Sequence, residues 1–109
     1  MGKAEARALK TELTQLLAHL LKLAYSPATD PRSHWEQELI LQRLNIEALL
    51  SDNPGSTPRM VELHASAWNS ARRLALAALR QDGARDIPEA NPFTLEQVRH
   101  PDCLPGQSG

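Results

Sequence analysis

The sequence predicts an all-α fold, a single domain built as a small bundle of three main helices with a short fourth helix near the C-terminus. Leucine and alanine recur at the three- and four-residue spacing of amphipathic helices. Aromatic and β-branched residues, which favour strands, are scarce. Clusters rich in proline, together with glycine, asparagine or serine, divide the chain into segments. Within one domain over 1–109, we expect helices at about 3–25, 33–51, 58–82 and 95–99 and an irregular tail at 100–109.

The first expected helix carries a wide apolar stripe. Its leucines cover an arc of about 160° at 100° per residue, which is wide enough to contact two neighbouring helices at once. The residues at the centre of this argument are Leu9, Leu13, Leu16 and Leu20.

Local signals define the next two helices. Ser33 and Glu36 have the spacing of a capping box, which predicts a helix that starts at Ser33. Thr57 is the expected N-cap of the third helix, with Pro58 at its first position. The spacing of the third helix predicts a buried face made of Val61, Ala65, Trp68, Ala75 and Leu79, with Ala71 and Ala78 beside it and Gly83 as the C-terminal cap.

A sharper signal lies near the C-terminus. Thr94 and Gln97 form a second capping box, and Phe93 with Val98 has the spacing of a hydrophobic staple. We expect a helix of one or two turns there, docked on the bundle through Phe93, Leu95 and Val98.

Composition argues against several classes of protein, namely nucleic-acid-binding, membrane and secreted disulfide-bonded proteins. The net charge of −1 provides no global field that would attract nucleic acid or an anionic membrane. The longest apolar stretch is too short to span a bilayer, and no signal peptide is visible. The single Cys103 leaves no internal disulfide framework and favours a reducing compartment. We therefore expect a cytoplasmic protein.

Four stretches of the chain resemble a bacterial family known as domain of unknown function 29. Tyr25-Ser26-Pro27 resembles the exit from the family's first long helix, and Trp35 followed by Gln42-Arg43 resembles its second helix. The start and the end of the resemblance are carried by Met1-Gly2-Lys3-Ala4-Glu5 with Leu16-Leu17-Ala18-His19-Leu20-Leu21-Lys22, and by Asn91-Pro92-Phe93-Thr94-Leu95-Glu96-Gln97-Val98 with Pro101-Asp102-Cys103-Leu104-Pro105. The resemblance covers nearly the whole chain and implies a helical fold, with no established activity, cofactor or catalytic residue.

The resemblance also implies a further N-terminal segment in typical members. We therefore expect Met1 to correspond to an internal methionine of the family, in a fragment, a chain with a misplaced start or a short natural version. If a covering helix is missing, part of the stripe formed by Leu9, Leu13, Leu16 and Leu20 is exposed. An exposed apolar stripe favours self-association or a partner helix.

Two polar residues fall near the apolar face of the second helix. Gln42 and Arg43 lie beside Leu39 and Ile46, so one or both should be partly buried, and a buried Arg43 needs a carboxylate or carbonyl groups. A functional interpretation is a polar groove formed by Gln42, Arg43 and His19. The alternative is a paired arginine that sets the helix register, with His19 hydrogen-bonded between helices.

Other chemistry has little support in the sequence. His100 and Cys103 form one close pair, whereas a structural zinc site needs four converging ligands, so we expect no metal and no cofactor. No nucleophile motif or phosphate-binding glycine loop occurs, and no catalytic residue is assigned. We expect a structural or protein-interaction module with a protein partner or a second copy. A nucleic-acid or regulatory module that uses Arg72 and Arg73 is the first alternative, and an enzyme with an unrecognised site is the second.

Overall fold

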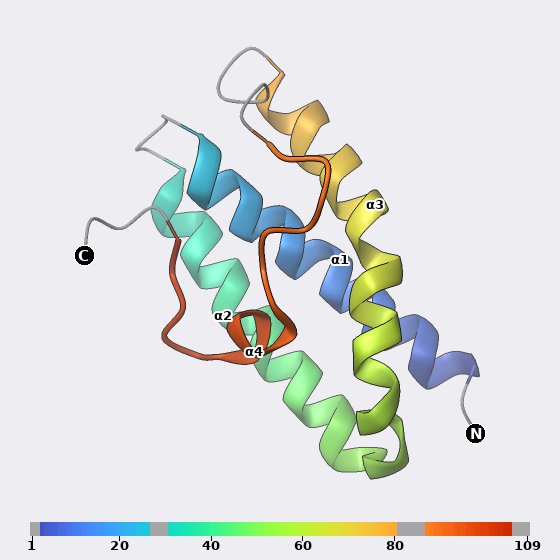
Figure 1. Cartoon of the computed structure of the whole chain (residues 1–109). Coiled ribbons are helices and arrows are strands. Elements are labelled where there is room, and N and C mark those ends of the chain that lie inside the picture. Colours follow the sequence, from blue (N-terminus) through green and yellow to red (C-terminus); the bar gives the residue numbers. More distant parts are fainter. Residues whose placement is uncertain (1–2, 27–30, 81–86, 106–109) are drawn as a thin grey trace.

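Helices account for almost all of the regular structure. The computed structural model describes residues 3–26, 31–80 and 87–105, and these residues contain no strand. The elements are α1 (Lys3–Tyr25), α2 (Arg32–Asp52), the 3₁₀ helix η1 (Pro54–Arg59), α3 (Met60–Leu79) and α4 (Leu95–Arg99) (Figure 1). The predicted all-α class, with three main helices and a short fourth, is confirmed.

Helix α1 lies between α2 and α3 and packs against both (Figure 1). The expectation that its leucine stripe is exposed is wrong, because Leu9, Leu13, Leu16 and Leu20 are completely buried. The width of the stripe explains this result. Two helices pack on α1 from two sides, and each covers part of the arc, so the chain buries the stripe without a partner.

Helix α2 begins one residue earlier than the capping-box pattern predicts. Its N-cap is Pro31, which makes no side-chain cap, and the Trp35 amide donates to the Pro31 carbonyl at 3.0 Å. Ser33 therefore lies inside the first turn, and the predicted Ser33 cap is wrong. A long-range contact fixes this start: the Arg32 guanidinium donates to the Leu23 carbonyl at the end of α1 over 2.8 Å.

The entrance to α3 also differs from the prediction. Residues from Pro54 to Arg59 form the tighter 3₁₀ turn, and the α-helix starts only at Met60. Met60 lies in the core, whereas Val61 is 69% exposed, contrary to its predicted burial. Ala65 and Ala78, also predicted on or beside the buried face, are exposed.

The rest of the predicted α3 face is buried, as expected, at Trp68, Ala71, Ala75 and Leu79. The α-helix ends at Leu79. Gly83, the predicted cap, lies outside the described residues.

Residues 87–105 return across the bundle and end the described chain (Figure 1). The predicted capping box of α4 is confirmed: Thr94 Oγ1 accepts from the Gln97 amide, and Gln97 Oε1 accepts from the Thr94 amide. Val98 is fully buried, and Phe93 and Leu95 pack on the core, which confirms the predicted docking. The short helix is therefore held both by its own cap and by the bundle.

The segment before α4 is anchored on α3 by three side chains, one of which is His64, whose Nε2 lies 3.0 Å from Asn91 Nδ2. The Trp68 indole donates to the Glu89 carbonyl at 2.7 Å, and Arg72 Nε donates to the Pro88 carbonyl at 2.8 Å. Ile87 is buried beside Trp68. These contacts fix an otherwise irregular stretch against the helix.

Candidate functional site

The sequence predicted that one or both of Gln42 and Arg43 are partly buried, and the structure buries both. Consecutive residues on an α-helix point about 100° apart. Gln42 accordingly meets α1, whereas Arg43 meets the C-terminal segment. His19 joins Gln42 but makes no hydrogen bond with Arg43, so the structure places the three predicted residues in two separate clusters.

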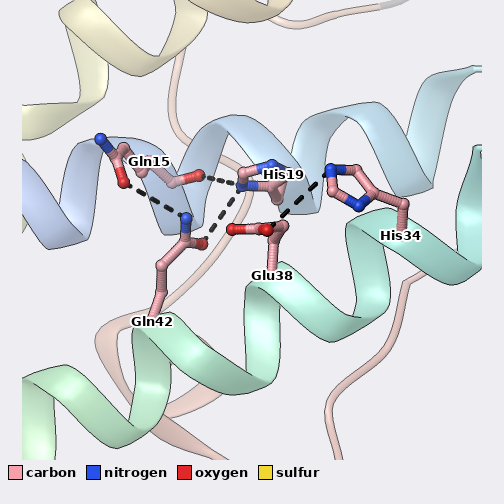
Figure 2. Close-up of polar contacts among 5 residues, drawn as sticks. All are labelled: Gln15, His19, His34, Glu38 and Gln42. Atoms are coloured by element: carbon pink, nitrogen blue, oxygen red, sulfur yellow. Dashed lines mark hydrogen bonds and ion pairs between the residues drawn. The ribbon is translucent and has the colours of Figure 1, made fainter.

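The first cluster joins α1 to α2 (Figure 2). His19 Nδ1 lies 2.8 Å from the Gln15 backbone carbonyl and 3.2 Å from Gln42 Oε1. Because a carbonyl oxygen can only accept, Nδ1 must carry the proton. Gln42 Nε2 in turn donates to Gln15 Oε1 at 3.4 Å. This network provides hydrogen-bond partners for both ends of the buried Gln42 amide. In a neutral His19, the ring nitrogen Nε2 is then the basic one.

Burial of the His19 ring lowers its pKa below the ordinary histidine value, and the nearby charge of Lys22 acts in the same direction. The hydrogen bonds to Gln15 and Gln42 oppose this shift but do not cancel it. The Glu38 carboxylate lies beside His19 and pairs with His34 at 3.9 Å (Figure 2). His19 is therefore neutral at pH 7 and hydrogen-bonds to amide groups. Such a contact fixes the position of α1 relative to α2.

The second cluster surrounds the Arg43 guanidinium. Nε donates to the Val98 carbonyl at 2.9 Å, and the two terminal nitrogens donate to the Gln97 carbonyl at 3.1 Å and the Pro101 carbonyl at 3.4 Å. The Gln97 and Val98 carbonyls belong to the end of α4, where helical carbonyls lack partners within the helix, and Pro101 lies two residues beyond the last residue of α4, Arg99. Burial lowers the pKa of Arg43, yet the guanidinium keeps its charge. Arg43 thus caps α4 from another helix, and its carbonyl partners meet the requirement that the sequence set for a buried arginine.

The other candidate ligands form no site within the described chain. His100, Pro101, Asp102 and Cys103 make a turn in which the amides of Asp102 and Cys103 donate to His100 Nδ1 and to the His100 carbonyl. Among the residues that the structure describes, no group of three or more His, Cys, Asp or Glu side chains could hold a metal ion. Arg72 is engaged with Pro88.

Sequence reasoning missed an apolar surface on α2. Ile40, Leu41 and Leu44 are 53%, 51% and 63% exposed. They point away from the buried face, which contains Leu39 and Ile46. We define the α2 outer row as the exposed residues of this side: Gln37, Ile40, Leu41, Leu44, Ala48 and Ser51. The sequence of α2 could have indicated this surface, because α2 carries more large aliphatic residues than one buried face of a helix can hold.

The fold and these clusters define an all-helical bundle domain whose buried polar groups serve helix-to-helix contacts. The chain matches the family described as domain of unknown function DUF29 over residues 1–104 and belongs to that family. No curated protein and no solved structure matches it. Within the part of the chain that the structure describes, none of the helices combines the length and apolar character needed to cross a membrane.

Proposed function

We propose that this domain is a protein-interaction module that pairs with a second copy of itself through the α2 outer row. The observation that carries the proposal is the exposure of Ile40, Leu41 and Leu44 on one side of one helix. Three large aliphatic side chains within two turns exceed the scattered single residues that a monomeric surface normally shows.

The spacing of the α2 outer row favours a helix as its occupant. Gln37, Leu41, Leu44, Ala48 and Ser51 follow one another at intervals of four, three, four and three residues. This alternation is the seam of a helix pair, in which each side chain packs between residues of the facing helix. A second α2 running antiparallel would place Leu41 of one copy against Leu44 of the other.

Charge favours a second copy over a charged partner. The α2 outer row itself contains no ionisable side chain, although the exposed residues His34, Glu47 and Asp52 of α2 flank it. The nearest exposed charges on its α4 side, Glu47 and Arg99, neutralise each other in an ion pair at 2.9 Å. A twofold pair requires a surface that complements itself, and an uncharged apolar surface meets that condition.

The size of the surface sets the expected affinity. Fourteen steps from Gln37 to Ser51 span about 21 Å, and one helix is about 10 Å wide. Such a contact lies below the ~1,200 Å² of total buried area typical of stable complexes. We therefore expect a reversible dimer with a dissociation constant in the micromolar range or weaker.

Light scattering across a dilution series tests the proposal. The native chain should approach twice the monomer mass as concentration rises, and Leu44→Lys should keep it monomeric. Val61→Lys is the matched control, because Val61 is equally aliphatic and 69% exposed but lies on α3. A native chain that stays monomeric at about 1 mM, or equal effects of the two variants, would overturn the proposal.

We also propose a bacterial, cytoplasmic setting. The family resemblance supports the bacterial source, and the single, unpaired Cys103 supports a reducing compartment. Fractionation of a bacterial host that carries the chain under its native promoter tests the location. Recovery in the periplasm would contradict it.

A further inference from the structure

A second surface lies on α1 and α3, away from the α2 outer row. Two adjoining depressions of about 430 Å³ and 360 Å³ share the residues Gln15 and Leu74 and so form one continuous groove. We call it the α1–α3 groove. Its lining consists of Arg7, Lys10, Thr11, Thr14, Gln15, Ala18, His19 and Lys22 from α1 and Ser70, Leu74, Ala77 and Ala78 from α3.

The α3 side of the groove is mainly apolar, and most of its side chains are small. Leu74 is half exposed at its centre, and Ala77 and Ala78 are exposed beside it. Small side chains at these positions let the backbone of another helix come close, while Leu74 offers an aliphatic anchor. Water covers this surface in the isolated chain, so an apolar occupant would gain free energy by displacing it.

The α1 side is basic. Arg7, Lys10 and Lys22 line the groove, and no carboxylate is among its lining residues. Glu12, which lies on the same helix, hydrogen-bonds to Asn45 of α2 instead. On α3, Arg73 is exposed next to Leu74. Positive charge therefore prevails along the groove, although the Glu38 carboxylate of α2 lies beside His19 at one edge.

Lys22 shows that this charge is incompletely solvated. Its ammonium lies 5.9 Å from the centroid of the Trp35 ring, and burial lowers its pKa. Because Trp35 belongs to α2, this ammonium lies on the side of α1 that faces α2.

We propose that the α1–α3 groove binds an acidic amphipathic helix of another protein. The distance from Arg7 to Lys22 is fifteen helical steps, about 22 Å, which corresponds to a partner helix of about four turns. Its apolar face would rest on Leu74 and the alanines, and its carboxylates would face the basic residues of α1. This partner differs from the second copy that binds the α2 outer row.

The lining favours an acidic peptide over nucleic acid. Single-stranded nucleic acid binds on exposed aromatic rings within a basic groove, and no Phe, Tyr or Trp lines this one. A duplex backbone would use the basic rim and leave the apolar floor around Leu74 unused.

Fluorescence anisotropy with a designed probe tests the proposal. The probe is a labelled helical peptide of about four turns, with a leucine and alanine face flanked by glutamates, and its matched counterpart carries lysines in place of the glutamates. The acidic peptide should bind, and the lysine peptide should not. Binding should weaken as salt rises, because exposed charges are screened.

Two variants locate the binding surface. Lys10→Glu should weaken binding of the acidic peptide by roughly fivefold to tenfold, since it replaces an attraction by a repulsion. Lys3→Glu is the matched control, because Lys3 is exposed on α1 but does not line the groove, and it should have little effect. Leu74→Gln should also weaken binding.

Three results would overturn the proposal. They are no binding of the acidic peptide at about 1 mM, equal effects of Lys10→Glu and Lys3→Glu, and tighter binding of a labelled DNA oligonucleotide than of the peptide at the same salt. The last result would assign the groove to nucleic acid.

Discussion

Replacing Arg43 by methionine should loosen the C-terminal segment and destabilise the whole domain. Arg43 makes two well-formed hydrogen bonds, at 2.9 Å to the Val98 carbonyl and 3.1 Å to the Gln97 carbonyl, and a longer one at 3.4 Å to Pro101. Methionine has a similar length and fills the same space, but it cannot donate. The carbonyls at the end of α4 would then lose their partner from α2.

The magnitude follows from these contacts. A hydrogen bond that involves a charged group contributes about 1.5–3 kcal/mol, and a bond near 3.4 Å contributes less. Methionine also removes the cost of burying a charge, which offsets part of the loss. We expect a net decrease of about 2–3 kcal/mol in the free energy of unfolding, or about 10 °C in Tm for a domain of this size.

Urea denaturation of the native chain and of Arg43→Met measures this difference. The control is Arg99→Met, because Arg99 lies in α4 itself and makes an exposed ion pair with Glu47. Such pairs contribute about 0–1 kcal/mol. Hydrogen exchange of the α4 amides should rise in Arg43→Met before the rest of the domain unfolds. Equal losses of stability in the two variants would refute the assignment of Arg43 as the cap of α4.

Four further changes test other contacts. Thr94→Ala removes the capping box of α4 and should cost about 1 kcal/mol in urea denaturation; no loss would mean that docking alone holds the helix. Trp68→Phe removes the indole bond to Glu89 and should raise hydrogen exchange across residues 87–93, whereas unchanged exchange would show that packing suffices. Leu13→Ala should cost about 2–5 kcal/mol of unfolding free energy, because Leu13 is fully buried; a loss below 1 kcal/mol would mean that the stripe is not covered in solution. The folded-state pKa of His19 lies below its unfolded value, so the unfolded chain binds the proton first, and stability should fall as pH drops through about 6.5. His19→Gln should reduce that fall, and an unchanged pH profile would contradict the assignment.

The sequence predicted those features that depend on neighbouring residues and on one dominant periodicity. The α4 capping box is contained within Thr94 to Gln97, and the structure forms it as expected. The same pattern at Ser33 failed, because the contact between Arg32 and the Leu23 carbonyl starts α2 earlier. The prediction for Val61 failed because the first turns of α3 bury the face that contains Met60, Leu63 and Ala67, and Val61 lies off that face.

The candidate site was predictable only in part. The position of Gln42 and Arg43 near an apolar face indicated burial, which the structure confirms. Their partners were not predictable, since Val98 lies 55 residues from Arg43 and no local pattern connects them. The exposed stripe was predicted on α1 rather than on α2, because periodicity gives the width of an apolar face and not the number of helices that cover it.

Cross-linking between copies tests the central claim most directly. A single cysteine is placed at Leu44 or at Val61 in a chain that carries Cys103→Ser, and each variant is treated with a short thiol-to-thiol cross-linker. The α2 outer row predicts a covalent dimer from Leu44→Cys and little from Val61→Cys, although both positions are exposed. Equal yields from the two variants, or no dimer from Leu44→Cys, would contradict pairing through α2.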